Sequence, residues 1–105
     1  MAERISPEQG LERLRAGDAL FVDVRDPGSH EQARIPGAVP LNQANLEQFL
    51  ADTDRQQPLV VYCYHGHSSQ GASDYLAEQG FHSVVSLDGG FEYWRQAHPE
   101  HVDSE

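Results

Sequence analysis

A run of five almost wholly apolar residues, Leu-Val-Val-Tyr-Cys at 59–63, constrains the fold of this chain more than any other feature. A strand with one face in solvent alternates apolar and polar residues, whereas a strand covered on both faces is apolar throughout. Fully covered strands of this kind are typical of parallel sheets. Helix-start signals follow after about five residues, at Ser68 or Ser69. The sequence therefore predicts a mainly parallel sheet.

Strand and helix signals alternate along the rest of the chain. Strands are predicted at 19–26, 38–41, 59–63 and 82–87, and residues 29–37 are expected to be irregular. Helices are predicted from Ser6 to Gly17, over 45–54, from Ser68 or Ser69 to Gly80, and over 89–98. Ser6 and Gln9, with Pro7 between them, match the capping box that begins a helix. This order of elements indicates an α/β fold.

A chain of 105 residues is the size of one ordinary domain. The sequence has no internal repeat, low-complexity tract or domain-sized linker. We expect a single domain over 1–105, with its core at about residues 5–96 and a frayed acidic tail at 102–105. A standalone domain of this size can be monomeric, and we expect a monomer.

Charge and cysteine content disfavour several classes of function. Seventeen acidic and seven basic residues give a formal net charge of −10, which disfavours binding to nucleic acid or to an anionic membrane surface. One cysteine cannot form an internal disulfide, and a lone thiol fits a reducing compartment. Residues 1–18 carry charges where a signal peptide needs an apolar run, and no segment approaches the ~20 apolar residues of a membrane span. We expect a cytoplasmic protein.

The single cysteine, Cys63, lies where the carboxyl end of a parallel strand is predicted, the usual ligand-binding edge of an open α/β sheet. The short segment that follows must turn tightly, helped by Gly66, and directs backbone N–H groups inward beside a helix N-terminus. Such a site binds anions and favours a thiolate over a thiol. A free cysteine in a strand is commonly a small buried hydrophobe. Its position before a glycine and two serines favours the alternative, a nucleophile.

Four segments resemble the single-domain rhodaneses, in particular the GlpE-type thiosulfate sulfurtransferases: LFVDVRDP at 20–27, RIPGAVPLN at 34–42, CYHGHSSQGASDYL at 63–76 and SLDGGFEYWR at 86–95. The resemblance extends over about residues 5–94. It implies a rhodanese-like α/β fold, with a mainly parallel central sheet flanked by helices on both faces. It also implies a ping-pong reaction in which the Cys63 thiolate takes the outer sulfur of thiosulfate and releases sulfite. The Cys63 persulfide then passes its sulfur to cyanide or to a thiol.

The resemblance assigns roles to particular residues. Cys63 is catalytic, and the loop that binds substrate and persulfide comprises Tyr64, His65, Gly66, His67, Ser68 and Ser69. From their position alone, Asp23, Arg25 and Asp26 end a strand at the same expected edge. They are candidates to contact the loop, with Asp23 and Arg25 as possible support for it, the alternative being local pairing that caps the strand. Gly89 and Gly90 are expected to form a tight turn into the last helix. No organic cofactor is implied, and the histidine spacing matches no metal motif, so no metal is expected.

Two positions depart from the family pattern, which has Asn where His67 stands and Lys where Gln70 stands. Both changes leave less fixed positive charge beside the sulfur, and the net charge of −10 opposes the approach of an anion. We therefore expect weak binding of thiosulfate or a different sulfur donor. Protonation of His67 in acid would attract anions, because histidine is the side chain that ordinarily titrates near pH 6.5.

Rival functions are a phosphatase, an arsenate reductase, a thiol peroxidase and a regulatory module. Cysteine phosphatases need an arginine after five intervening residues to clamp phosphate, and here that position is Ser69. Arsenate reduction would also need a stronger oxyanion clamp, and a peroxidase would need a resolving thiol from another molecule. A rhodanese-like binding module would not need Cys63. A persulfide carrier serving a protein partner stays open, with thioredoxin or dihydrolipoate as candidate thiol acceptors.

Overall fold

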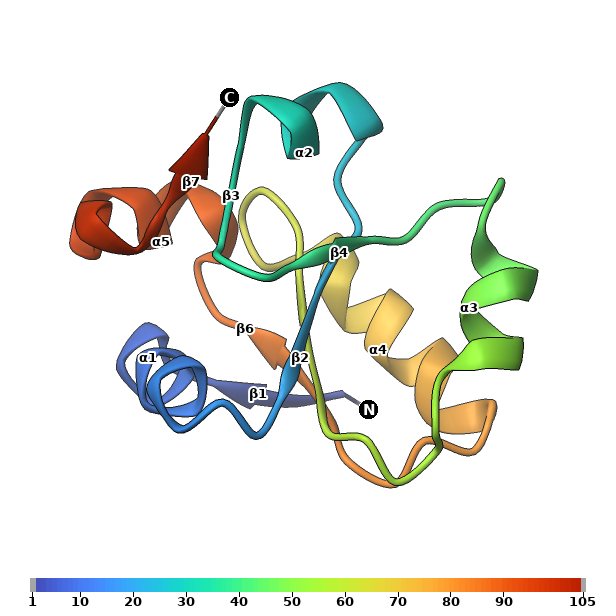
Figure 1. Ribbon diagram of the computed structural model, residues 1–105. Coiled ribbons are helices and arrows are strands. Elements are labelled where there is room, and N and C mark those ends of the chain that lie inside the picture. Colours follow the sequence, from blue (N-terminus) through green and yellow to red (C-terminus); the bar gives the residue numbers. More distant parts are fainter. Residues whose placement is uncertain (1, 105) are drawn as a thin grey trace.

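The apolar run forms β5 (Leu59–Tyr62), the middle strand of a five-stranded sheet. The computed structural model describes residues 2–104 (Figure 1). Across the sheet the strands are β1 (Glu3–Ile5), β6 (Val84–Leu87), β5, β2 (Leu20–Asp23) and β4 (Val39–Pro40). Every neighbouring pair is parallel, as the sequence predicted. No helix in residues 2–104 has the length and apolar character needed to cross a membrane.

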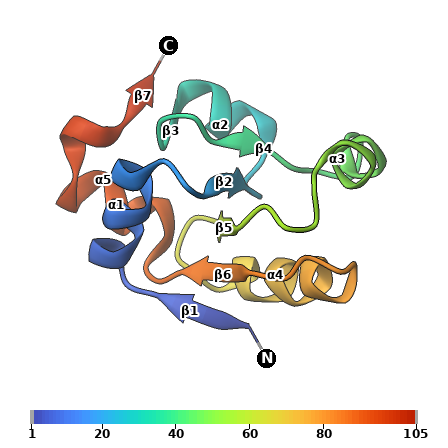
Figure 2. The same cartoon turned by 60° about the horizontal axis from the view of Figure 1, so that its bottom comes forward.

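Helices cover both faces of this sheet (Figures 1 and 2). One face carries α1 (Pro7–Ala16) and α5 (Gly90–Ala97), and the other carries α3 (Leu46–Asp52) and α4 (Ser68–Glu78). A shorter helix, α2 (Pro27–Gln32), follows β2, and a 3₁₀ turn, η1 (Pro99–His101), follows α5. The expected α/β architecture with helices on both faces is therefore confirmed.

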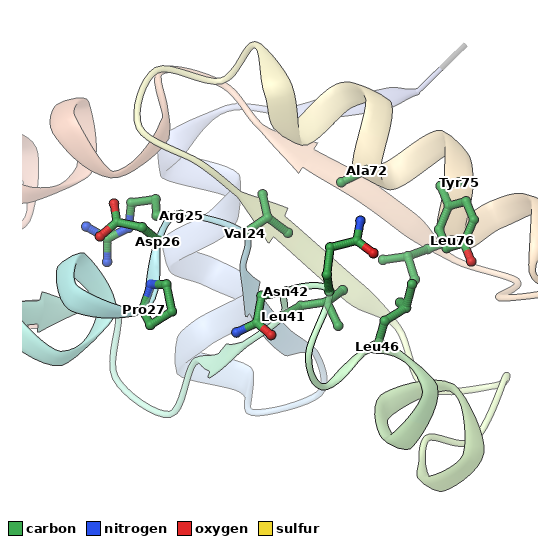
Figure 3. Close-up of a pocket in the computed structure, with 11 residues that line it drawn as sticks. Val24, Arg25, Asp26, Pro27, Leu41, Asn42, Leu46, Ala72, Tyr75 and Leu76 are labelled. Atoms are coloured by element: carbon green, nitrogen blue, oxygen red, sulfur yellow. The ribbon is translucent and has the colours of Figure 1, made fainter.

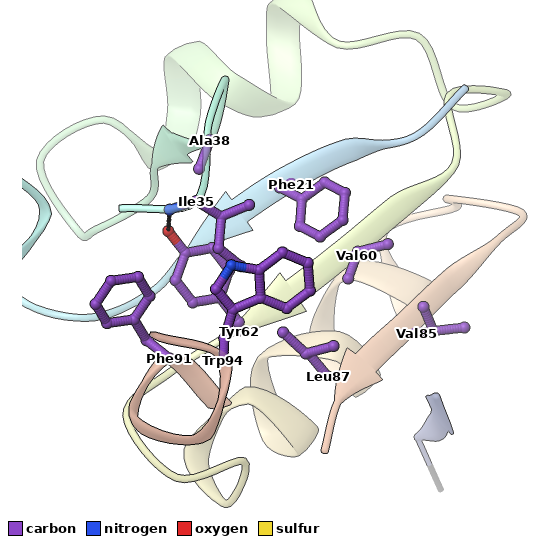
Figure 4. Packing of buried hydrophobic residues seen from close by; sticks show 9 residues of the cluster. All are labelled: Phe21, Ile35, Ala38, Val60, Tyr62, Val85, Leu87, Phe91 and Trp94. Atoms are coloured by element: carbon purple, nitrogen blue, oxygen red, sulfur yellow. Dashed lines mark hydrogen bonds between the residues drawn. The ribbon is translucent and has the colours of Figure 1, made fainter. Parts of the chain in front are cut away.

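Side chains of β5 alternate between two apolar cores. Val60 and Tyr62 face the core formed with α1 and α5, whereas Leu59 and Val61 face the core formed with α3 and α4. Figure 4 shows the first core, where the hydroxyl of Tyr62 accepts a hydrogen bond of 3.2 Å from the backbone N–H of Ile35. Burial on both faces explains why the only polar side-chain group of this strand is the hydroxyl of Tyr62, which is hydrogen-bonded.

The capping box predicted for α1 is present. The backbone N–H of Gln9 donates to Ser6 Oγ at 3.1 Å, and the backbone N–H of Ser6 donates to Gln9 Oε1 at 2.9 Å. Gly17 ends the helix with a φ of 71°, in the left-handed region that glycine adopts without strain. Both ends of α1 are thus set by local sequence.

Several short elements were not predicted. β1 is an edge strand of three residues, and α2 lies in a segment expected to be irregular. Strand β7 (Asp103–Ser104) pairs antiparallel with β3 (Ala33–Arg34). The tail expected to be frayed is therefore ordered as far as Ser104, while position 105 lies outside the described residues. Val102 packs against the α1/α5 core, which gives this end of the chain apolar contacts.

Candidate active site

Cys63 directly follows β5, and the loop from Cys63 to Ser68 delivers the chain into α4. Gly66 turns the loop with a φ of 89°, and a Cβ at this position would lie 2.9 Å from the backbone nitrogen of Gly89. No other residue fits there without displacing backbone. The loop is therefore a tight strand-to-helix turn, as the sequence predicted.

Hydrogen-bond donors converge on the sulfur of Cys63. The backbone N–H of Gly66 donates to Sγ at 3.2 Å, and that of Ser69 donates at 3.3 Å. The Ser69 hydroxyl lies 3.3 Å from Sγ and 2.8 Å from the hydroxyl of Ser86 on β6. Ser69 and Ser86 are both fully buried, and Cys63 is 3% exposed. This sulfur is surrounded by polar groups and not by hydrocarbon alone.

These contacts set the charge state of the thiol. Burial by itself raises the pKa of Cys63, but hydrogen bonds from the side chains of Ser68 and Ser69 and from the N–H groups of Ser69 and Gly66 lower it to about 7. A group with that pKa is roughly half ionised at neutral pH. The thiolate is the nucleophilic form of cysteine, so the loop holds a large fraction of the sulfur in its reactive state.

The N-terminus of α5 holds the loop from the other side. The backbone N–H of Phe91 donates to the carbonyl of Cys63 at 2.8 Å, and that of Glu92 donates to the carbonyl of Tyr64 at 3.0 Å. A Cβ at Gly90 would lie 2.5 Å from the carbonyl carbon and oxygen of Tyr64. The predicted tight turn at Gly89 and Gly90 is present, but its contact with the loop was not foreseen. The adjacent glycines were the signal that could have indicated it.

The remaining loop side chains surround a depression of about 380 Å³ above the sulfur. Its wall consists of Cys63, Tyr64, His65, His67 and Ser68. The hydroxyl of Tyr64 is bound to the Asp26 carboxylate and lies 2.8 Å from Ser29 Oγ, which fixes its ring. His65 and His67 are exposed, and Gln70 Nε2 donates to the carbonyl of Gly66 at 2.8 Å. The entrance to the sulfur is therefore bordered by two histidines, a tyrosine and a serine.

Asp23 and Arg25 form a buried ion pair behind this loop. Arg25 Nη2 lies 2.7 Å from Asp23 Oδ2, and the two side chains are 3% and 0% exposed. Burial raises the pKa of Asp23, yet hydrogen bonds from Arg25 and His30 hold it below its usual value. The guanidinium lies 4.2 Å from the ring centre of Phe91 and 5.8 Å from that of Tyr64. The pair therefore packs beside Tyr64 and Phe91 and lies outside the set of atoms that touch the sulfur.

Ser86 is a site residue that sequence reasoning missed. It lies within a strand that reads as apolar, and its partner Ser69 is distant in the sequence. Asp26 was one of three strand-end candidates to contact the loop, and the structure places its carboxylate against the hydroxyl of Tyr64. Within residues 2–104, no group of three or more His, Cys, Asp and Glu side chains is placed to hold a metal ion.

Comparison with known proteins identifies the family. The Rhodanese-like domain profile matches residues 6–97. The chain is 46% identical over 101 residues to thiosulfate sulfurtransferase GlpE of Pseudoalteromonas translucida (strain TAC 125), covering 96% of each chain. It is 50% identical over 101 residues to GlpE of Stutzerimonas stutzeri (strain A1501), covering 96% of this chain and 92% of the relative.

A solved structure agrees with the fold. The rhodanese-like domain of the Alr3790 protein from Anabaena sp., determined by solution NMR, superposes with a TM-score of 0.87 at 21% identity. The match covers 100% of this chain and 81% of that domain. The resemblance found in the sequence is thus confirmed over nearly its whole length. The chain belongs to the rhodanese-like domain family.

Proposed function

We propose that this protein is a thiosulfate sulfurtransferase in which Cys63 carries the transferred sulfur as a persulfide. Its curated relatives at 46% and 50% identity bear the name thiosulfate sulfurtransferase. The observation that carries the assignment is the convergence of the Gly66 and Ser69 N–H groups on Cys63 Sγ, at 3.2 and 3.3 Å. Fixed donors of this kind stabilise negative charge on sulfur both before and after transfer.

In the first half-reaction the Cys63 thiolate attacks the outer sulfur of thiosulfate. The new bond joins Sγ to that sulfur, the sulfur–sulfur bond of thiosulfate breaks, and its electron pair leaves on sulfite. In the second half-reaction cyanide or a thiolate attacks the outer sulfur of the persulfide, and the electron pair of the cleaved bond returns to Cys63. No step needs an external oxidant or an organic cofactor.

Tyr64, His65, Gly66, His67, Ser68 and Ser69 form the substrate and persulfide loop in this proposal. Gly66 and Ser69 supply N–H groups to the sulfur, Tyr64 holds the loop to Asp26, and the histidines border the entrance. Asp23 and Arg25 support the loop through their packing against Phe91 and Tyr64.

The sulfur acceptor is cyanide or a thiol, with dihydrolipoate or thioredoxin as candidates. We place the protein in the cytoplasm, because a lone thiol fits a reducing compartment. We expect a monomer, because a standalone domain of this size can be monomeric. A regulatory rhodanese-like module is the rival assignment, and it would have no use for donors directed at a thiolate. A persulfide carrier for another protein uses the same first half-reaction and differs only in the acceptor.

Intact mass spectrometry tests the proposal directly. After incubation with thiosulfate, the wild-type protein should gain the mass of one sulfur atom, and Cys63→Ser should gain none. Cyanide should then remove the added mass and release thiocyanate. A wild-type protein that gains no mass, or a Cys63→Ser variant that does, would contradict the assignment.

A further inference from the structure

A groove lies at the carboxyl edge of the sheet (Figure 3). Its wall is formed by the loop after β2, the segment that joins β4 to α3, the start of α3, and α4. It encloses about 680 Å³, within the range of roughly 300–1,000 Å³ that is usual for small-molecule sites. Its wall is mainly apolar, with Val24, Leu41, Leu46, Ala72, Tyr75 and Leu76. The proposed function leaves this groove without a role.

The groove begins beside the reactive sulfur. Val22 and Val61 belong to the core on the α3 and α4 side. Val24 and Cys63 directly follow β2 and β5. Val24 packs against that same core, and Cys63 Sγ lies 3.3 Å from Ser69 Oγ on α4, so both side chains lie on that face of the sheet. The backbone N–H of Val24 donates to the carbonyl of Tyr62 at 2.9 Å, so the strands stay adjacent, ~4.8 Å apart, up to this edge.

Two further observations place the groove next to the depression above Cys63. Ser68 borders the depression, and Ala72, four residues later on the same face of α4, borders the groove. At 1.5 Å per helical residue these positions are ~6 Å apart. Tyr64 borders the depression and is bound to Asp26, which borders the groove. A ligand in the groove therefore reaches the outer sulfur of a persulfide with a short chain.

The charges at the groove disfavour an anion. The guanidinium of Arg25 is turned away into its pair with Asp23 and is 3% exposed. Hydrogen bonds from Tyr64 and Ser29 lower the pKa of Asp26 to about 2, so this carboxylate at the groove is negatively charged at neutral pH. An anionic chain would be repelled by Asp26, whereas an uncharged aliphatic chain would bury apolar surface.

We propose that this groove is the acceptor subsite and that it selects uncharged thiols carried on an aliphatic chain over anionic thiols such as dihydrolipoate. This inference rests on the proposed sulfurtransferase function. The acceptor thiolate attacks the outer sulfur of the Cys63 persulfide and forms a new sulfur–sulfur bond. The bond from that sulfur to Sγ breaks, its electron pair returns to Cys63 as the thiolate, and the acceptor leaves as a persulfide anion, so that charge balances with the persulfide anion formed in the first half-reaction.

Single-turnover transfer from the persulfide-loaded protein tests the proposal. The protein is loaded with thiosulfate, desalted and mixed with mercaptoethanol, mercaptobutanol, mercaptohexanol or the anionic mercaptohexanoate. Each rate constant is divided by that for cyanide on the same preparation. We expect the ratio to rise by about twofold to fourfold for each added methylene, the upper value corresponding to full burial of a CH₂. The ratio for mercaptohexanoate should fall below that for mercaptohexanol.

Variants of the groove provide the control. Tyr75→Ala removes an exposed wall of the groove, and Ala72→Leu fills its end near Ser68, so both should flatten the dependence on chain length. Tyr93→Ala is the matched control, because Tyr93 is also an exposed tyrosine, 46% against 40% for Tyr75, but lies on α5. It should keep the wild-type dependence.

The results separate this inference from the proposed function. If the protein takes no sulfur from thiosulfate, the proposed sulfurtransferase function is wrong. If the protein takes up sulfur from thiosulfate and cyanide removes it, but the transfer rate does not depend on the chain length of the thiol, only the proposed acceptor subsite is wrong. Equal ratios for mercaptohexanol and mercaptohexanoate, or a flattened dependence in Tyr93→Ala, also overturn it.

Discussion

The hydroxyls of Ser69 and Ser86 determine how the sulfur of Cys63 is solvated. Ser69 Oγ lies between Cys63 Sγ at 3.3 Å and Ser86 Oγ at 2.8 Å. When the sulfur is a thiolate, Ser69 donates to it and accepts from Ser86, so both hydroxyl dipoles point toward the negative charge. Hydrogen bonds of this kind strengthen one another in a buried setting.

Replacing Ser69 with Ala should raise the pKa of Cys63. The substitution removes a donor to the charged form while the backbone N–H of residue 69 stays in place. A hydrogen bond to a charged group contributes about 1.5–3 kcal/mol, which corresponds to about one to two pKa units. The pH dependence of alkylation by iodoacetamide measures the shift. The rate should reach half its maximum near pH 7 in the wild type and at a higher pH in Ser69→Ala.

Ser73→Ala is the matched control for that measurement. Ser73 lies one turn further along α4, and its buried hydroxyl has no hydrogen-bond partner among the described residues. Its removal should leave the titration of Cys63 unchanged. An alkylation midpoint in Ser69→Ala equal to that of the wild type would show that the backbone N–H groups alone hold the thiolate.

The histidine at position 67 should act on substrate capture rather than on persulfide formation. His67 is exposed and borders the depression above the sulfur. A protonated imidazole adds a unit charge, worth about 1 kcal/mol a few ångströms away in water, or roughly fivefold in binding. His67→Asn should therefore raise KM for thiosulfate in acid and leave it unchanged in alkali. The control is His82→Asn, another exposed histidine outside the depression. An identical pH profile in His67→Asn and wild type would refute this role.

At the scale of elements, two helix N-termini meet at the loop from opposite sides. The first turn of α4 donates to the sulfur of Cys63, and the first turn of α5 donates to the carbonyls of Cys63 and Tyr64. Turning these carbonyls toward α5 leaves the neighbouring N–H groups free to face the sulfur. The packing of α5 therefore shapes the loop through the backbone carbonyls of Cys63 and Tyr64.

Gly90→Ala should disrupt this arrangement. Gly90 has a φ of 62°, and an added Cβ would lie 2.5 Å from Tyr64 backbone atoms. Backbone strain and overpacking together should lower the free energy of unfolding by at least about 2 kcal/mol. Urea denaturation measures this loss, and intact mass spectrometry should show less persulfide at equal protein concentration. Gly71→Ala on α4 is the control, because its Cβ would meet nothing within 4 Å, and it should be neutral or stabilising. Equal stabilities of the two variants would contradict the account.

Elements with strong local signals were predictable, and elements held by distant partners were not. The apolar run of β5 and the capping box at Ser6 identify their elements directly. β1 has three residues, two of them charged, and forms only because β6 offers an edge. At α2, Asp26 caps the helix through the N–H of Ser29, but Asp-Pro-Gly reads equally well as a turn.

The features of the active site also divide into those that local sequence predicts and those that depend on distant partners. The position of Cys63 and the tight turn at Gly66 follow from sequence because the strand, the glycine and the helix start are contiguous. The contact from Ser69 to Ser86 spans 17 residues, and that from Tyr64 to Asp26 spans 38. Contacts across such separations depend on which strands become neighbours, and one sequence does not specify that pairing.

The negative charge of the whole molecule opposes the binding of an anionic substrate at the active site. A formal net charge of −10 repels dianionic thiosulfate, while the N–H groups at Cys63 attract it over hydrogen-bond distances. The two effects differ in range. Salt screens charges separated by more than the Debye length, and it weakens short contacts inside the loop far less.

Raising the ionic strength should therefore lower KM for thiosulfate. Between about 0.01 M and 0.1 M the Debye length falls from about 30 Å to about 10 Å, which removes most of the long-range repulsion and leaves the loop contacts in place. We expect KM to fall by roughly twofold to fivefold, since surface potentials amount to several kT. Steady-state kinetics in increasing sodium chloride measures it. Alkylation of Cys63 by the uncharged reagent iodoacetamide, at a pH well above 7 where the thiol is already ionised, is the control that should not respond. A KM that rises with salt, or saturation at low micromolar thiosulfate in ordinary salt, would mean that attraction by the loop outweighs the charge of the molecule.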